Sequence, residues 1–249
     1  MKVINDLIGY KDMKVVQNTE WFSFSLDSVL LPRFVTINKD VKNILDVGTG
    51  NAPIPLILST RTKANIYGVE IQRDIYELAV ETIEINKKRK QIKIINDDIK
   101  NIDQYFKYGF FDVIVSNPPF FKIEEYSKKN EDIHKRIARH EMKLNAEEII
   151  MIASNYLKNN GVLAMVHRSD RLIELIELFR KYKIEPKKIQ LIYPKKSKDA
   201  NILLIEGRKN GNPGLKILPS IIAHNDDGSY SEQVKQYFSK ERKYESKKL

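Results

Sequence analysis

The sequence predicts an α/β fold, in which an open and mostly parallel sheet carries helices. Residues 43–47 form a buried apolar run, and a glycine-containing turn connects it to a helix that begins near Ile54. Strand, glycine turn and helix together make the supersecondary unit that binds nucleotides. Short β-rich runs and amphipathic stretches then alternate along the chain, and we count seven strands. The 249 residues, 42% of them hydrophobic, suffice for one sizeable core.

The predicted elements divide the chain into one main domain with two appended segments. We expect an N-terminal cap segment at residues 1–35, the α/β domain at residues 36–210, and a C-terminal extension with a basic tail at residues 211–249. Residues 1–23 are mixed in character and predict no element.

The composition excludes several classes of protein and site. No apolar run approaches the roughly 18 residues that cross a bilayer, and the first residues lack the pattern of a signal peptide, so we expect a cytoplasmic protein. With zero cysteines there are no disulfides and no Cys-type zinc site, and four scattered histidines argue against a His-rich metal site. We expect no metal.

The charge balance favours a polyanionic partner. The formal net charge is +10 and the pI is about 9.4, which is typical of proteins that bind nucleic acid. An AT-rich genome, which enriches lysine, would produce a similar composition. Charge alone therefore supports a nucleic-acid partner only modestly.

Residues 24–34 predict a short helix whose apolar side chains face the sheet. Ser25 or Asp27 could cap its first turn. Asp27 is the polar residue of interest here, because it lies at the start of the helix and is a candidate for ligand binding.

The glycine turn predicts a cofactor site. Gly48 and Gly50 let the backbone approach a ligand closely, and Asn51 belongs to the same turn. Glu70, 20 residues after Gly50, ends the next predicted strand, where an acid can bind ribose hydroxyls. Ile71 follows it.

Two departures from the dinucleotide pattern indicate which cofactor is bound. Pro53 occupies the position of the third glycine, and Asp46 precedes the turn. An acid there would repel a pyrophosphate but could help to hold a cation. The pattern therefore argues against NAD and favours S-adenosylmethionine, whose sulfonium and amino groups are positive.

The third predicted strand, residues 92–95, ends in a pair of acids. Asp97 and Asp98 lie where an acid can accept a hydrogen bond from the amino group of the cofactor adenine, with Ile99 against the ring. We favour Asp98 over Asp97. An ordinary aspartate turn is the alternative.

The fourth predicted strand ends in Asn117-Pro118-Pro119-Phe120. Neither proline has a backbone N–H and each fixes its own φ, so the turn is stiff and its carbonyls lack local donors. The Asn117 side-chain carbonyl and a main-chain carbonyl can then bind one planar NH2 group, and Phe120 can cover it. A plain proline-rich turn is the alternative.

The rest of the chain predicts further elements of the same fold. Residues 121–144 form a polar connection, which either faces a substrate or is a solvated surface. Residues 145–148 have the pattern of a capping box, and Ser169 or Asp170 could cap a helix that ends at Phe179. A basic hairpin at residues 194–198 could contact phosphates. Predicted strands flank these elements at residues 161–167, 188–193 and 201–206, and residues 239–249 are a basic tail.

Residues 24–208 resemble the class I S-adenosylmethionine-dependent methyltransferases. The resemblance implies a Rossmann-like, seven-stranded, mostly parallel sheet with helices on both faces and the last strand antiparallel. Residues 117–120 resemble the motif of the amino-methyltransferases, which act on adenine N6, guanine N2 or glutamine N5.

A set of four segments is similar to the bacterial family of valine-tRNA adenine-37 N6-methyltransferases: residues 24–31, 46–50, 138–141 and 224–230. This resemblance implies that the target is an RNA adenine, with adenine 37 in the anticodon loop of a valine tRNA as the first candidate. It also implies two sets of site residues. The cofactor is held by Asp46, Gly48, Gly50, Glu70 and Asp98, and the target base by Asn117, Pro118 and Phe120. The proline-rich residues 51–55 depart from the family pattern.

Three rival functions remain open at this point. A guanine-N2 rRNA methyltransferase shares the four-residue motif, and a glutamine-N5 protein methyltransferase usually has tyrosine in place of Phe120. A non-catalytic RNA-binding module would use the same fold without transfer. The expected partner is tRNA, with no membrane, and a monomer is favoured although the sequence does not address oligomeric state.

Overall fold

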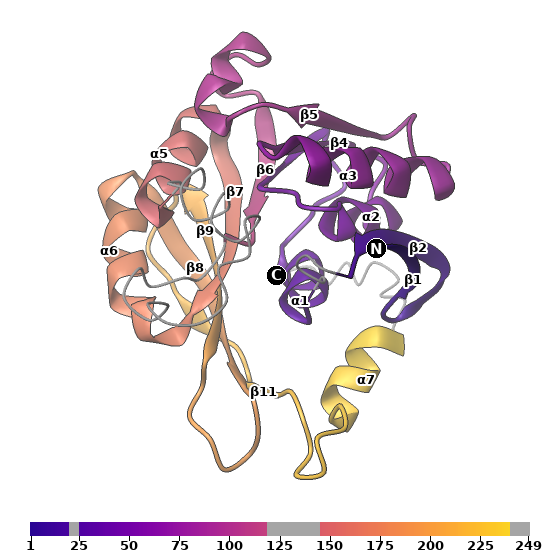
Figure 1. Ribbon diagram of the computed structural model, residues 1–249. Helices are drawn as coiled ribbons and strands as arrows, with labels where there is room; N and C mark the ends of the chain where they lie inside the picture. The colour runs from indigo at the N-terminus through magenta and orange to yellow at the C-terminus, as the bar shows by residue number, and fades with distance from the viewer. Residues whose placement is uncertain (20–24, 119–144, 240–249) are drawn as a thin grey trace, which may run out of the picture.

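A central sheet organises the part of the chain that the structure describes, a computed structural model covering residues 1–19, 25–118 and 145–239. Its spatial order is β10-β8-β9-β7-β6-β3-β4-β5, and β11 also pairs with β8 (Figure 1). The strands are β3 (Asn43–Val47), β4 (Asn65–Glu70), β5 (Ile92–Asn96), β6 (Phe111–Ser116), β7 (Leu157–Arg168), β8 (Ile184–Tyr193), β9 (Ile202–Lys209), β10 (Lys216–Ile217) and β11 (Ile221–Ile222).

The sheet confirms the predicted class of fold. Strand β9 runs antiparallel to both β7 and β8, and the other described pairings within this sheet are parallel. The chain moves outward from β3 through β4 to β5 and then returns to β6 on the other side of β3. Ligands in such sheets bind where the strand order reverses, beyond the carboxyl ends of the strands. Strands β10 and β11 extend the sheet beyond the seven strands that the sequence predicts.

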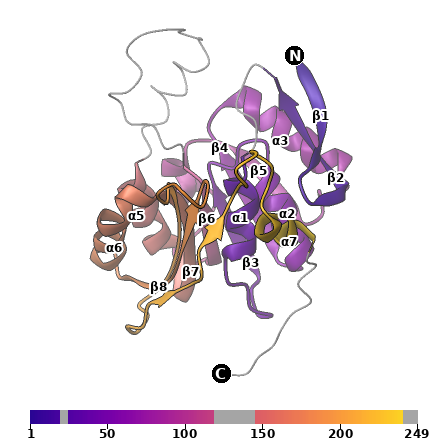
Figure 2. The same ribbon diagram turned by 90° about the horizontal axis from the view of Figure 1, so that it is seen from below.

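Helices cover both faces of the sheet (Figure 2). They are α1 (Asp27–Phe34), α2 (Pro53–Arg61), α3 (Arg73–Ile85), α5 (Ala146–Tyr156), α6 (Leu172–Lys181) and α7 (Glu232–Ser239), with 3-10 turns η1 (Ile99–Gln104) and η2 (Ser169–Arg171). Apolar side chains of α1, α2, α3 and α7 share one core, and those of η1, α5 and α6 share the other. Among the described residues, no helix is long and apolar enough to cross a membrane.

The N-terminal residues form a hairpin that the sequence does not predict. Strands β1 (Lys2–Leu7) and β2 (Tyr10–Asn18) pair antiparallel, and Gly9 takes a left-handed φ of 80° in the turn. Leu7 and Val15 are buried in the same core as α1 and α2. The division into an N-terminal segment, a main domain and a C-terminal extension stays a prediction.

Some predicted helix caps are wrong. Helix α6 begins at Leu172 without a side-chain cap, because the Ser169 hydroxyl donates to the Ala200 carbonyl and Asp170 pairs with Arg168. Helix α1 likewise has no side-chain cap, and Ser25 donates to the Asp27 carboxylate instead (3.3 Å). The predicted capping box is confirmed: Asn145 and Glu148 bond reciprocally at the start of α5.

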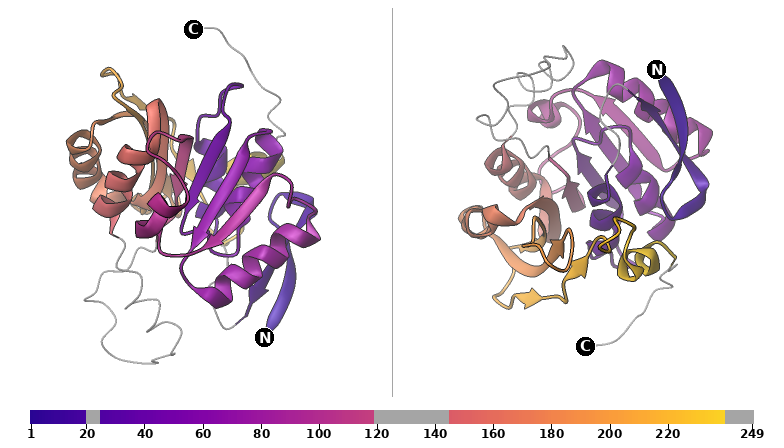
Figure 3. Two further views of the ribbon diagram at one scale, coloured as in Figure 1. Left: turned by 90° about the horizontal axis from the view of Figure 1, so that it is seen from above. Right: turned by 60° about the horizontal axis from the view of Figure 1, so that its bottom comes forward.

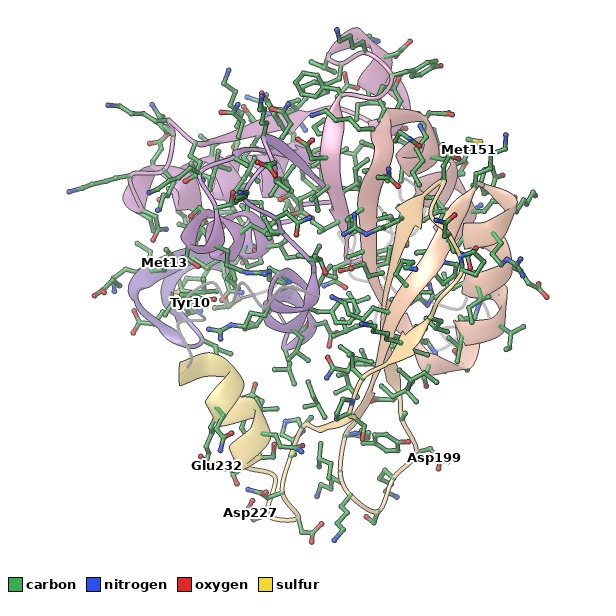
Figure 4. The ribbon with its side chains drawn as sticks, turned by 180° about the vertical axis from the view of Figure 1, so that it is seen from behind. Tyr10, Met13, Met151, Asp199, Asp227 and Glu232 are labelled. Atoms are coloured by element: carbon green, nitrogen blue, oxygen red, sulfur yellow. The ribbon has the colours of Figure 1, made fainter. Side chains whose placement is uncertain are left out.

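The predicted basic hairpin is a longer connection between β8 and β9, covering residues 194–201. It lies beside the turn at residues 224–230, and the Lys195 ammonium donates to the Asp226 carbonyl (2.9 Å). Figure 4 labels Asp199 and Asp227 in these two loops and Glu232 at the start of α7. Lys196 and Lys198 are exposed.

A buried ion pair attaches the segment after α1 to the sheet. The Glu206 carboxylate on β9 accepts from the Thr36 N–H (2.7 Å), the Thr36 hydroxyl (2.8 Å) and the Lys188 ammonium (3.0 Å). Lys188 also donates to the Phe34 carbonyl at the end of α1 (2.7 Å). These contacts fix the end of α1 against β8 and β9.

We expect Glu206→Gln to destabilise the fold by roughly 2–4 kcal/mol. The Lys188 ammonium then loses its buried carboxylate partner, and the new amide NH2 group faces the N–H and hydroxyl donors of Thr36. Urea unfolding measures the change. The control is Glu77→Gln, which breaks an exposed pair with Arg73 and should change stability by no more than about 0.5 kcal/mol. Equal effects of the two substitutions would contradict this role for Glu206.

Candidate active site

The turn after β3 follows a path that needs left-handed residues. Gly48 has φ +71° and Gly50 has φ +57°, a region that residues with a side chain rarely adopt. The N–H groups of Gly48 and Thr49 both donate to the Val69 carbonyl at 3.0 Å. The turn after β3 is therefore held against β4.

Asp46 is fully buried directly below this turn. Its Oδ2 accepts from the Thr49 hydroxyl (2.7 Å), whereas Oδ1 has no hydrogen-bond partner in the part of the chain that the structure describes. Burial, opposed by the Thr49 hydrogen bond and assisted by the nearby Glu70 charge, raises the pKa of Asp46 to about 7. The chain thus keeps a buried acceptor without a donor.

Glu70, at the end of β4, is 5% exposed and connects two backbone segments. Its Oε2 accepts from the Gly50 N–H and its Oε1 from the Gln72 N–H, both at 3.0 Å. Burial raises the pKa of Glu70, and these hydrogen bonds act in the opposite direction. Glu70 therefore braces the glycine turn, and its predicted contact with a ribose stays a prediction.

Gly68 is a residue of the site that sequence reasoning missed. A Cβ on Gly68 would lie 2.8–2.9 Å from side-chain atoms of Thr49. Only glycine at this strand position lets Thr49 fold over β4 and reach Asp46. A glycine inside a strand is a known sign of such a close approach, so the signal was present in the sequence.

The two acids after β5 have different partners. Asp97 Oδ1 accepts from the Asp98 N–H (2.7 Å) and the Asn101 amide (2.8 Å), and its Oδ2 accepts from the Tyr105 hydroxyl (2.7 Å). Asp98 caps η1 by accepting from the Lys100 N–H at 2.9 Å. Both oxygens of Asp97 are engaged, whereas one oxygen of Asp98 has no partner among the described residues.

Asn96 is a second residue that sequence reasoning missed. Its amide donates to the Glu70 carbonyl (2.8 Å) and to the Ile71 carbonyl (3.2 Å). These bonds hold the end of β5 against the end of β4. Ile99 is buried in the core under η1, and Ile71 is half-buried.

Asn117 meets α1 at the end of β6. The Asn117 amide nitrogen donates to the Ser28 hydroxyl oxygen (3.2 Å), which leaves the Asn117 side-chain oxygen as an acceptor. Ser28 and Asp27 are both buried, and burial raises the pKa of Asp27 against the hydrogen bond from Ser25. Pro118 is buried. Pro119, Phe120 and the predicted connection at residues 121–144 lie outside the described residues.

Register places the predicted site residues along one edge of the sheet. Val47 pairs with both Ser116 and Val69, and Glu70 pairs with Asn96. The segments that carry Gly48, Asn117, Ile71 and Asp97 therefore leave neighbouring strands at the same edge. Direct contacts join Asp46 with Thr49, Gly50 with Glu70, and Asn117 with Ser28. Asn51 differs: its amide donates to the Val16 carbonyl in β2 (2.9 Å).

Comparison with known proteins now decides the family. A family model described as "Methyltransferase small domain" matches residues 25–188. The chain belongs to this family. It is therefore an S-adenosylmethionine-dependent methyltransferase, and the enzyme class expected from the sequence is confirmed.

Two relatives of this methyltransferase carry the same name, tRNA1(Val) (adenine(37)-N6)-methyltransferase. The one from Flavobacterium johnsoniae is 30% identical over 186 residues, which cover 74% of this chain and 77% of the relative. The one from Porphyromonas gingivalis is 28% identical over 235 residues and 91% of each chain. The expected family resemblance is confirmed at this level.

Solved structures confirm the fold. A predicted O-methyltransferase from Agrobacterium tumefaciens superposes with a TM-score of 0.66 at 19% identity, covering 85% of this chain and 95% of that one. A Pyrococcus horikoshii TYW2 in complex with MeSAdo gives a TM-score of 0.59 at 13% identity, covering 84% and 72%.

Replacing Asp46 with asparagine tests the buried acid through pH. The unfolded carboxyl ionises near pH 4, and in the folded protein its pKa is raised to about 7. Between these values the folded state holds a proton that the unfolded state has released, so this group makes the fold less stable as pH rises. The free energy of unfolding of Asp46→Asn relative to wild type should increase by roughly 2–3 kcal/mol from about pH 5 to about pH 8.

Urea unfolding of wild type and Asp46→Asn between about pH 5 and about pH 8 measures this difference in the free energy of unfolding. An unpaired amide in the variant adds a pH-independent offset, and Asp27 is the same in both proteins. Glu70 loses a neighbouring carboxyl in the variant, but its charge is a smaller cause of the Asp46 shift than burial, so burial still dominates the expected pH dependence. A difference that stays constant with pH would show that Asp46 does not titrate in this window.

Proposed function

We propose that this methyltransferase transfers a methyl group to the N6 amine of an adenine in RNA, with adenine 37 in the anticodon loop of a valine tRNA as the target. The names of the relatives support a tRNA substrate. The observation that carries the proposal is the orientation of Asn117: its amide nitrogen is held by Ser28, so its oxygen is free to accept from an amine.

The chain fits S-adenosylmethionine at the glycine turn. When bound, this cofactor supplies an activated methyl group on a positively charged sulfur. Asp46 Oδ1 is a buried acceptor without a partner, which suits a cationic ligand beside the backbone of Gly48 and Gly50. In this proposal Asp46 and the backbone of the turn hold the methionine part, and Asn51 acts on the cofactor through the shape of that turn. Asp27 on α1 adds a further polar contact.

The remaining cofactor contacts lie on the neighbouring strand ends. Glu70 would bind the ribose hydroxyls, since an acid after the second strand is placed for that role. Asp98 would accept from the cofactor adenine through the oxygen that η1 leaves unused. Ile71 and Ile99 would contact the adenine ring.

The target amine would bind between Asn117 and Pro118. Two acceptors, the Asn117 side-chain oxygen and the Pro118 carbonyl, can each take one hydrogen of a planar NH2 group. This turns the nitrogen lone pair out of conjugation and toward the methyl group, so orientation supplies much of the rate. The new N–C bond forms as the S–C bond breaks, and the nitrogen then loses its extra proton to solvent. Phe120 is proposed to stack on the base.

The RNA side of the proposal rests on charge and on access to the base. An anticodon-loop base is already unpaired, so placing it in a pocket costs less than extrusion from a duplex. The net charge of +10 favours a polyanion, and exposed Lys196 and Lys198 would contact phosphates. We also propose that the enzyme is a monomer and acts in the cytoplasm.

Methyl transfer from labelled S-adenosylmethionine to unmodified total tRNA, unmodified rRNA and a protein extract tests the substrate. We expect label in N6-methyladenosine from the tRNA sample, found by nucleoside analysis. Label in N2-methylguanosine or in protein glutamine would replace the proposed substrate and keep the fold and cofactor. Cofactor binding without transfer to any sample would favour a non-catalytic RNA-binding module.

Asn117→Ala should nearly abolish transfer and leave cofactor affinity within about twofold of wild type, because the variant loses an acceptor for the target amine while the proposed cofactor contacts of Asp46, Glu70 and Asp98 stay in place. Ser28→Ala should lower kcat about tenfold, since one hydrogen bond that orients the amide is lost. Rate assays and cofactor titration measure both effects.

Asn65→Ala is the matched control. Asn65 is exposed at the start of β4, at the opposite edge of the sheet, and its loss should leave kcat unchanged. Loss of cofactor binding in a folded Asn117→Ala protein would refute the proposed division between amine site and cofactor site.

A further inference from the structure

The outer edge of β2 is paired with side chains instead of a strand. On its inner edge β2 pairs with β1. On the outer edge the Lys14 N–H donates to Asn86 Oδ1 (3.0 Å) and the Asn86 amide donates to the Lys14 carbonyl (2.6 Å). Two residues on, the Val16 N–H donates to Thr82 Oγ1 (3.0 Å), and the Val16 carbonyl accepts from the Asn51 amide (2.9 Å).

Three polar side chains thus take the place of a neighbouring strand. Thr82 on α3 and Asn86, the residue that caps the end of α3, stand one helical turn apart. This distance matches the two-residue spacing of the outward backbone groups of β2. Thr82 is fully buried. Lys2 on β1 adds an ion pair with Glu81 on α3. The hairpin is therefore fixed to α3, beside which it lies in the left-hand view of Figure 3.

A second contact fixes the hairpin to α1. The Arg33 guanidinium lies 5.0 Å from the centre of the Tyr10 ring, and Figure 4 labels Tyr10 together with Met13 on β2. Leu7 and Val15 also enter the core that α1 and α2 share. Because three elements hold β2, the Val16 carbonyl is a fixed point beside the glycine turn.

Asn51 lies between two residues of the glycine turn that have left-handed backbone conformations. These residues are Gly50, with a φ of 57°, and Ala52, with a φ of 67°. Ala52 is a residue with a Cβ in the left-handed region, which is unfavourable without surrounding contacts. The Asn51 amide anchors this pair of left-handed residues to Val16. The amide nitrogen is thereby committed to the hairpin.

We propose that Asn51 is a positioning residue, and that the β1–β2 hairpin sets the affinity for the cofactor by holding the glycine turn through the Val16–Asn51 hydrogen bond. This inference rests on the proposed cofactor site. Thr82 accepts from the Val16 N–H, whereas Asn51 donates to the Val16 carbonyl. Thr82 therefore fixes the same residue of β2 to α3. Ligand binding and hairpin order are then coupled in both directions.

Titration of S-adenosylhomocysteine into the full chain tests the coupling with a double-mutant cycle. Asn51→Ala and Thr82→Val should each raise the Kd about fivefold, as expected for one ordinary hydrogen bond. The double variant should raise it by clearly less than the product of the two, because both act through β2. The cofactor KM should rise with the Kd, and kcat at saturation should stay unchanged.

Conservative variants separate positioning from direct contact. Thr82→Ser keeps the hydroxyl acceptor and should restore wild-type affinity. Asn51→Asp has the same shape but sets a carboxylate against the Val16 carbonyl, so it should weaken binding more than Asn51→Ala. If Asn51 instead contacted the ammonium group of S-adenosylhomocysteine directly, the added negative charge would preserve or tighten binding.

Two controls keep the test decisive. Glu77→Gln changes an exposed residue of α3 and should leave the Kd unchanged. If Thr82→Val fails to fold, Asn86→Ala loosens β2 one turn away and replaces it in the cycle. Hydrogen exchange adds an independent measurement: S-adenosylhomocysteine should slow exchange at the Val16 amide, which contacts no proposed ligand group.

Two different binding results distinguish an error in the role of the hairpin from an error in the proposed cofactor site. If wild type binds S-adenosylhomocysteine and Thr82→Val binds equally well, or if the two substitutions act independently, the hairpin does not set cofactor affinity. If wild type does not bind it at all, the proposed cofactor site fails and this inference fails with it.

Discussion

Two buried carboxylates beneath one glycine turn are the constraint on which the site depends. Asp46 and Glu70 lie near the ends of neighbouring strands, and burial raises the pKa of both carboxyls. The Glu70 charge raises the pKa of Asp46 as well. Backbone N–H groups compensate Glu70, and a single hydroxyl compensates one oxygen of Asp46. The fold therefore concentrates negative charge where a cation can relieve it. That arrangement explains why a methyltransferase can use a turn that would repel the pyrophosphate of a dinucleotide.

The sequence predicted the elements whose signals are local. Buried strands, the glycine turn, the Asn145 capping box and the convergence of strand ends all follow from patterns a few residues long, and the structure and the comparisons confirm the fold class. The family motifs also identified the right chemistry class. The roles of individual residues stay predictions.

The features that the sequence did not predict depend on partners far apart in the chain. Strand β1 has only one buried residue, Leu7, so it shows no alternating pattern, and β2 is held by side chains 35, 66 and 72 residues away. Ser28 orients Asn117 across 89 residues. The predicted caps of α6 were wrong for the same reason, since Ser169 prefers a carbonyl 31 residues further on. Thr49, in the turn after β3, packs directly against Gly68 on β4, 19 residues further along the chain.

The antiparallel direction of β9 places the connection between β8 and β9 at the same edge of the sheet as the turns after β3, β4 and β5, but on different strands. Because β9 lies between β7 and β8 and runs against both, the connection from β8 to β9 turns at the carboxyl edge, where the polypeptide also leaves β6 and β7. The turns proposed to hold the cofactor belong to β3, β4 and β5 on the other side of the strand reversal. The connection at residues 194–201 therefore leaves the sheet from strands that carry none of these turns. Its length and charge can vary without a change in any strand that carries a proposed cofactor residue, so the two parts of the carboxyl edge can diverge independently.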